Sequence, residues 1–222
     1  MKSGLVIGLI LLPFSVSAKP GVAEAFWKLS RPEKGWVLAH PFKAKRAFHV
    51  TQQVRHTTDS LYRLQLPDTF RHGGRIDAFR HSYWMAMLTQ RIGERPSRKL
   101  GRCHERGNRI KYRKGKTEDG YIQDATACEM DLHNNEEGIR LALEHPDEGQ
   151  DGMARECLKA IRSGKMKILF INADGAYCDC DGKPVNMVRK GMDKWKLPIC
   201  LLSSEWPQPV SRKTHVSQPA KQ

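Results

Sequence analysis

Residues 76–93, with the sequence IDAFRHSYWMAMLTQRIG, decide the fold because both faces of the helix that they predict carry side chains suited to an interior. One face is apolar and aromatic at helical spacing: Phe79, Tyr83, Ala86 and Met87. The other face is mixed: Asp77, Arg80, His81, Trp84 and Leu88. Since neither face is purely solvated, we expect this helix to be covered on both sides in a helical bundle.

Further helices are predicted around this segment. Residues 19–66 have helical periodicity, with a capping box in Ser30-Arg-Pro-Glu33 and a break at Pro41. Gly73-Gly74 leads into the central helix, and the later helices are expected at 97–108, 121–144 and 153–163. A strand run at 167–171, a turn at Asp174-Gly175 and a return strand at 176–180 predict a hairpin. The predicted fold class is mainly α, a helical bundle with a small C-terminal β-hairpin.

The composition suits one globular domain of an exported protein. Of 222 residues, 39% are apolar, which is enough for a core and excludes wholesale disorder, collagen, coiled-coil and multi-pass membrane classes. Residues 1–18 have the pattern of a signal peptide: Lys2, an apolar run, and small residues up to Ala18. We expect residues 19–202 to form a single domain and 203–222, which contain three prolines, to form a flexible tail.

Charge is strongly segregated along the chain, whose net charge is +14. Residues 91–116 have a net charge of +9, from eleven Lys/Arg against two Glu. Residues 117–151 have a net charge of −10, from eleven Asp/Glu against one Arg. We expect the two segments to neutralise each other, and few aromatic residues interrupt the basic one. The sequence therefore argues against nucleic acid as a partner and favours attraction to a membrane surface somewhat more.

The six cysteines are an even set, and in an oxidising compartment they predict disulfides. A bridge between Cys103 and Cys128 is expected because both flank the polar groups described next. Disulfides of the later cysteines are expected to fix the C-terminal part of the chain. The alternative, a zinc site built from Cys178, Cys180 and Cys200, ranks lower because C-x-C is tighter than the usual spacing of structural zinc ligands.

Three predicted helices each present polar groups four residues apart, which places each pair on one helical face. The pairs are Asp77 with His81, His104 with Asn108, and Asp131 with Asn135. Apolar residues surround all three pairs, and a buried ionisable group is costly unless it is paired or bound to a metal. If the helices pack together, the three pairs converge on one pocket.

Residues 104–108 approximate the H-E-x-x-H zinc motif, with Asn108 replacing the second histidine. We expect a single zinc or manganese ion bound by His81 and His104 with Asp77 or Asp131. Glu105 would be the general base, and Arg80 would stabilise an anionic intermediate. In a metal-free alternative, His81 or His104 is the base and is oriented by Asp77 or Asp131.

A purely structural interpretation remains open, because buried polar networks also hold helices in register. In that case Asn108 and Asn135 belong to such a network and no reaction takes place. Gly138 lies on the same predicted face as Asp131 and Asn135, and is expected to allow a close helix contact.

The three blocks together resemble a bacterial domain family of unknown function. They are Asp77-Ala-Phe-Arg-His-Ser-Tyr-Trp84 (D-A-F-R-H-x-x-W), His104-Glu105, and Met130-Asp-Leu-His-Asn-Asn-Glu-Glu-Gly138 (M-D-L-x-N-N-x-x-G). The resemblance covers roughly residues 70–180 and implies a mostly helical domain, sometimes found in secreted or toxin-like chains. It brings no established reaction, so it marks these residues as signature positions only: Asp77, Arg80, His81, His104, Glu105, Asp131 and Asn135. The cysteines look like additions to the pattern.

The function predicted from the sequence is an exported hydrolase, metal-assisted, acting on an envelope component or another extracellular substrate. One alternative is a non-catalytic envelope or host-interaction module with a structural polar cluster. Another is a secreted toxin that acts on nucleic acid through residues 91–116.

Overall fold

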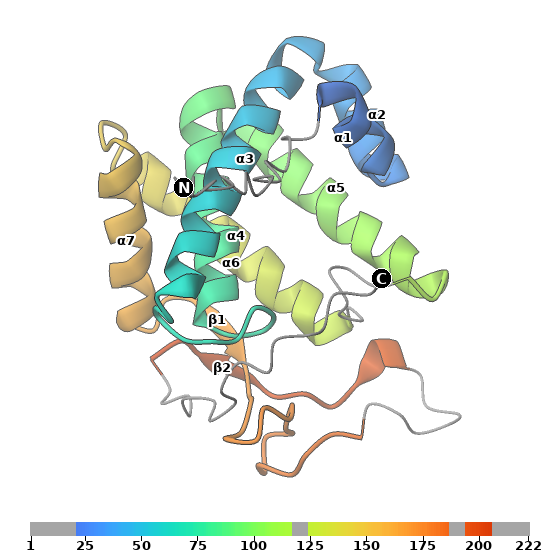
Figure 1. Ribbon diagram of the computed structural model, residues 1–222, viewed down its shortest axis with the longest axis vertical. Coiled ribbons are helices and arrows are strands. Elements are labelled where there is room, and N and C mark those ends of the chain that lie inside the picture. Colours follow the sequence, from blue (N-terminus) through green and yellow to red (C-terminus); the bar gives the residue numbers. More distant parts are fainter. Residues whose placement is uncertain (1–20, 117–123, 187–193, 206–222) are drawn as a thin grey trace, which may run out of the picture.

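The computed structural model describes residues 21–116, 124–186 and 194–205, in which there are seven α-helices, a 3-10 helix and one two-stranded sheet (Figure 1). The expected signal peptide and nearly all of the expected tail lie outside these residues. The helices are α1 Val22–Lys28, α2 Arg31–Ala39, α3 Pro41–Arg63, α4 Arg75–Ile92, α5 Glu94–Arg113, α6 Ala125–Glu144 and α7 Gln150–Arg162. The other elements are β1 Lys167–Leu169, η1 Lys194–Lys196 and β2 Leu201–Ser203.

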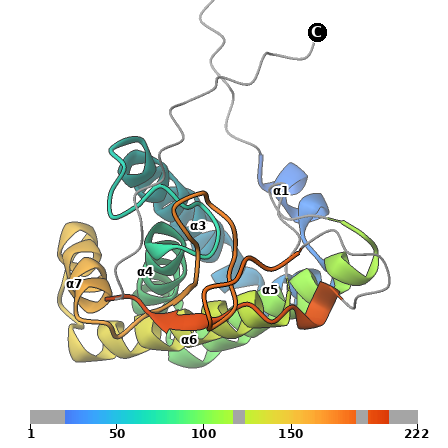
Figure 2. The same ribbon diagram turned by 90° about the horizontal axis from the view of Figure 1, so that it is seen from below.

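Helix α4 is the centre of the bundle, as its sequence predicts. It packs against α3, α5, α6 and α7, and both of its faces are buried. Figures 1 and 2 show it enclosed by the other helices. Its side chains form much of one continuous core with Trp36 of α2 and Met153 of α7. A mainly helical fold with a small C-terminal sheet is therefore confirmed.

The predicted caps and breaks set the course of the N-terminal helices. Ser30 and Glu33 form the expected reciprocal capping box at the start of α2, and Pro41 is the first residue of α3. The Trp36 indole donates a hydrogen bond to the Pro96 carbonyl, which ties α2 to the start of α5. Helix α5 is longer at both ends than the expected 97–108.

The sheet is paired differently from the predicted hairpin. Strand β1 is antiparallel to β2, with Ile168 opposite Leu202. The expected return strand 176–180 contributes isolated bridges only, from Tyr177 to Ile171 and from Cys178 to Pro184. A three-residue strand at 201–203 leaves almost no periodic signal in a sequence, so it was missed. Ser203 therefore belongs to a strand, and the Ser204 side chain is buried.

The cysteines form one disulfide, between Cys180 and Cys200, which joins the segment after β1 to the start of β2. The expected bridge between Cys103 and Cys128 is wrong, since both are free thiols. Cys103 lies about 200° around α5 from Glu105, and Glu105 is the α5 residue that faces Cys128. Cys178 is also free, and with Cys180 and Cys200 bonded to each other the alternative zinc site is excluded. Within the described residues, none of the helices is long and apolar enough to cross a membrane.

Candidate metal centre

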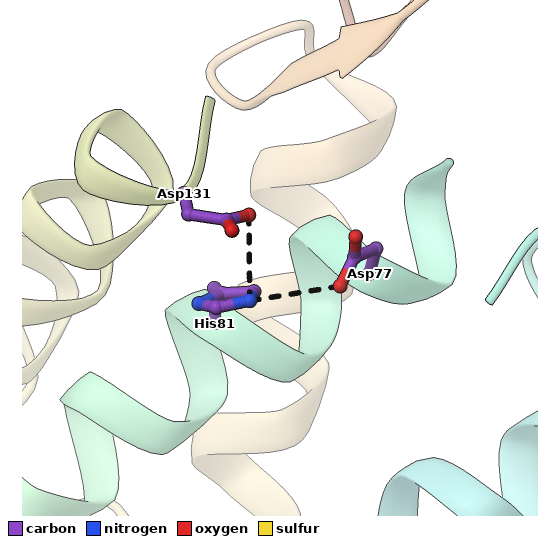
Figure 3. Close-up of side chains that lie close together, drawn as sticks. All are labelled: Asp77, His81 and Asp131. Carbon is purple, nitrogen blue, oxygen red and sulfur yellow. Dashed lines mark ion pairs between the residues drawn. The ribbon is translucent and has the colours of Figure 1, made fainter. Parts of the chain in front are cut away.

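Three buried side chains meet where α4 crosses α6. Asp77 and His81 lie one turn apart on α4, and Asp131 projects from α6 toward them (Figure 3). His81 Nε2 is 3.3 Å from Asp131 Oδ1 and 3.6 Å from Asp77 Oδ1. One potential ligand atom from each residue lies within 4.8 Å of the other two. The two sequence blocks that hold these residues are thus brought together as predicted.

These separations fit metal ligation better than direct hydrogen bonding. Good N–H···O bonds have heavy-atom distances near 2.9 Å, which is shorter than either contact of His81 Nε2 with the carboxylates. Two ligands held about 2.0 Å from one tetrahedral ion lie about 3.3 Å apart. The donor set of one imidazole and two carboxylates, with no sulfur, suits zinc or manganese.

The fourth member of the cluster is Arg80. Its Nη2 is 2.6 Å from Asp77 Oδ1 and 3.2 Å from His81 Nε2. A guanidinium group can only donate a hydrogen bond, and an ionised carboxylate can only accept one. His81 Nε2 would need a lone pair for Arg80 and a hydrogen for the carboxylates, and it cannot carry both at once. Asp77, His81 and Asp131 are at most 3% exposed, and a charge buried in this way is costly unless it is paired or bound to a metal.

The backbone holds the two α4 ligands in place. Asp77 Oδ2 accepts a 2.7 Å hydrogen bond from the Gly73 amide, just before the helix begins. Asp68 accepts hydrogen bonds from the amides of Phe70, Arg75 and Ile76, which fixes the first turn of α4. Asp77 is thereby aimed into the bundle and not toward solvent.

Helix α6 reaches the cluster because Gly138 lets it approach α4 closely. A Cβ atom at Gly138 would overlap the backbone of Ser82, which is the neighbour of His81 in sequence. The expected close contact at Gly138 is confirmed. Asn134 fixes the other side of α6, since its amide exchanges hydrogen bonds with the backbone of Lys167 in β1.

His104 is not part of the three-residue group. Its Nδ1 is 2.9 Å from Glu33 Oε1, on α2, and its ring centre lies 6.2 Å from that of His81. Among the described residues, the group whose potential ligand atoms all lie within 4.8 Å of one another contains one histidine and two aspartates, and His104 lies outside it. Glu33 was recognised in the sequence only as a capping residue. Its contact with His104 arises because Gly107 lets α2 lie close against α5 at Ser30.

The Glu33 carboxyl group is ionised over a wide pH range. Burial raises its pKa, but the hydrogen bond and the charge of His104, together with hydrogen bonds from Ser30, lower it to about 2. Because an ionised carboxylate only accepts, His104 Nδ1 must carry the shared hydrogen. In the neutral imidazole Nε2 is then the basic nitrogen, and it lies 4.0 Å from Glu105 Oε1.

Glu105 is buried and is held by its neighbours on α5. Its Oε2 accepts a 3.2 Å hydrogen bond from Asn108 Nδ2, and Lys111 Nζ lies 3.4 Å from Asn108 Oδ1. Burial, together with the charges of Glu105 and Asp131, raises the pKa of the Cys128 thiol well above its ordinary value. Cys128 therefore lies near both carboxylates and stays protonated.

Asn135 is also buried and faces α5, where its amide lies against Gly101. Neither its amide nitrogen nor its oxygen has a hydrogen-bond partner within the described part of the chain. The structure thus places Asn135 at the α5–α6 interface, whereas Asn108 directly contacts Glu105.

Comparisons with known proteins give a family but no reaction. The profile of a family described as Domain of unknown function (DUF6973) matches residues 34–165. The match begins in α2 and ends after α7, so it includes the whole candidate centre but not the sheet or the disulfide. No curated protein and no solved structure matches the chain.

Proposed function

This chain belongs to the DUF6973 family, and because that family carries no assigned reaction, we propose from the site itself that the protein is an exported, metal-dependent hydrolase. The metal ligands are Asp77, His81 and Asp131, and the metal is zinc or manganese. The observation that carries the proposal is the set of separations around His81 Nε2, which are too long for good hydrogen bonds and suit ligands of one ion.

The remaining polar groups fit the needs of hydrolysis. Three protein ligands leave an open position for water, as in catalytic zinc sites. Arg80, whose side chain is 26% exposed, lies at the edge of the cluster, where it can bind a developing negative charge. The ion supplies Lewis acidity and lowers the pKa of bound water.

His104 is a better general base than Glu105. Its side chain is 21% exposed whereas that of Glu105 is 4% exposed, so His104 can exchange protons with solvent. Because Glu33 holds Nδ1, Nε2 is the nitrogen that accepts a proton from water and passes it to the leaving group. Glu105 then supplies negative charge beside His104, as Glu33 does, and is not the primary acceptor of the proton.

Export and an extracellular substrate are part of the proposal. They are supported by the signal-peptide pattern of residues 1–18 and by the Cys180–Cys200 disulfide, which suits an oxidising compartment. An envelope component is the substrate class that this location favours.

The test compares two histidines that lie side by side. Protein purified without chelator is analysed for metal by elemental mass spectrometry, as wild type, His81→Ala and His104→Ala. We expect about one zinc or manganese ion per chain in the wild type and in His104→Ala, and none in His81→Ala. Ester, amide and phosphoester hydrolysis should require the metal and should fall in both variants, since His104 acts on the proton and not on the metal.

The structural alternative predicts a different pattern. If Asp77, His81 and Asp131 only hold α4 against α6, the wild type contains no metal, and His81→Ala lowers the melting temperature without any other effect. Metal that stays bound in His81→Ala would equally overturn the proposed ligand set.

A further inference from the structure

The outward face of α5 is a continuous row of positive charge. Six exposed cations recur at intervals of four and three residues, within an arc of about 80° opposite the buried face. The first and last lie 18 positions apart in sequence and therefore about 27 Å apart along the helix. This row, called the α5 cation row below, consists of Arg95, Lys99, Arg102, Arg106, Arg109 and Arg113.

The acidic segment that follows in sequence does not neutralise the row within the described residues. Glu136 contacts Arg98 and Arg102, and Glu94 contacts Arg98. Two other acidic residues of α6, Glu137 and Glu144, form ion pairs with Arg140 of the same helix. Within the described part of the chain, four members of the row have no acidic partner: Arg95, Lys99, Arg106 and Arg113.

The aromatic residue of the basic segment, Tyr112, gains a second aromatic partner from a distant part of the chain. Trp195 of η1 lies against Tyr112, near the C-terminal end of α5. Its ring centre is 5.1 Å from that of Tyr112, and the Arg109 guanidinium lies 5.5 Å from the Trp195 ring centre. A hollow of about 200 Å³ is lined there by Arg109, Tyr112, Arg113, Trp195 and Lys196.

Over residues 21–116, 124–186 and 194–205, neither ground on which the sequence argued against nucleic acid holds: acidic side chains leave most of the row unpaired, and an aromatic pair lies at its end. We propose that the α5 cation row and the hollow at Tyr112 and Trp195 form a binding surface for single-stranded nucleic acid. The row follows the phosphates, and the aromatic pair offers a stacking surface to an unpaired base. A lipid surface fits less well because the row contains no apolar side chain to insert between lipids.

The salt dependence of binding tests the row. Affinity for a fluorescent oligo(dT) of about 15 nucleotides is measured by anisotropy over a series of salt concentrations. For Lys99→Gln/Arg106→Gln/Arg113→Gln, the slope of log K against log[salt] should become shallower by about 2, since each lost phosphate contact removes about 0.7. The matched control is Arg55→Gln/Arg155→Gln/Arg162→Gln, which removes the same charge from exposed positions on α3 and α7 and should leave the slope unchanged.

The aromatic contact is tested separately. Trp195→Ala should weaken binding of oligo(dT) about fivefold or more, whereas Trp27→Ala, at an exposed position on α1, should not. A duplex of equal length should bind more weakly than the single strand, because its bases are not available for stacking. Circular dichroism confirms that each variant is folded.

The surface is independent of the metal centre, so His81→Ala should bind oligo(dT) like the wild type even if no hydrolysis is ever found. Equal salt slopes for the two triple variants would overturn the proposal. So would stronger retention on vesicles of phosphatidylglycerol than on oligo(dT), because the row would then serve a membrane.

Discussion

Glu33 Oε1 on α2 lies 2.9 Å from His104 Nδ1 on α5, while Oε2 of the same carboxylate accepts a hydrogen bond from the Ser30 amide. One carboxylate therefore caps a helix and orients an imidazole. The two roles connect the start of α2 with the interior of the bundle, so a change at Glu33 affects both the stability of the fold and the direction in which His104 Nε2 points.

Glu33→Gln should destabilise the protein at neutral pH and have little effect in strong acid. The pKa of Glu33 is lowered in the folded state from 4.5 to about 2, which corresponds to about 3 kcal/mol of stability. For a lowered pKa, this contribution is complete above about pH 4.5 and is lost as the pH falls toward 2. Urea unfolding of both proteins at pH 7, 4.5, 3 and 2 should show the difference shrinking over that interval.

Ser30→Ala is the control for the capping role. It removes the hydroxyl that accepts from the Glu33 amide but leaves the contact between Glu33 and His104. We expect a loss of about 1 kcal/mol whose dependence on pH between 2 and 7 is weaker than that of Glu33→Gln, because the Ser30 side chain lowers the pKa of Glu33 less than His104 does. An equal pH dependence in both variants would contradict the assignment of the lowered pKa to His104.

Gly138→Ala should separate α4 from α6. The added methyl group would overlap the Ser82 backbone, and overpacking costs about 1–3 kcal/mol, which exceeds the gain in helix propensity. Gly35→Ala, in α2, is the opposite case because nothing lies within 4 Å of its Cβ position. Thermal unfolding should therefore show a lower melting temperature for Gly138→Ala and an unchanged or higher one for Gly35→Ala.

Alkylation of the unfolded, unreduced protein should modify four thiols. These are Cys103, Cys128, Cys157 and Cys178, and in the folded protein only the half-buried Cys103 should react readily. Cys180→Ala/Cys200→Ala should cost about 3 kcal/mol, as expected for closing a loop of about 20 residues, whereas Cys103→Ser should cost much less. Two alkylated thiols, or none, would contradict the observed pairing.

The helices could be predicted from the sequence because their signals are local. Periodicity, the Ser30–Glu33 capping box and Pro41 fix where α2, α3 and α4 begin to within a few residues. The partner of β1 could not be predicted, because its choice depends on contacts far apart in the chain. The Cys180–Cys200 bond and the packing of Leu169 with Leu197 and Ile199 bring residues 201–203 to β1.

The candidate centre was predictable in part for the same reason. Asp77 and His81 share a face through helical spacing alone, and Asp131 joins them from α6. Helical spacing also places His104 on a buried face, but it does not say which helix covers that face. Packing of α2 at Gly107 decides this, and so His104 contacts Glu33 and does not join the ligands.

The effect of Asp131→Asn on stability distinguishes a metal centre from a network that is only structural. Without metal, Asp77 and Asp131 are two buried carboxylates with oxygens within 4.8 Å of each other, so the amide should relieve the repulsion between them and stabilise the protein. A gain of about 1 kcal/mol would raise the melting temperature by about 3 °C. Added zinc or manganese should then raise the melting temperature of the wild type but not that of Asp131→Asn, as measured by differential scanning fluorimetry with and without chelator. If the network is only structural, the substitution instead breaks the contact with His81 and lowers the melting temperature whether or not metal is added.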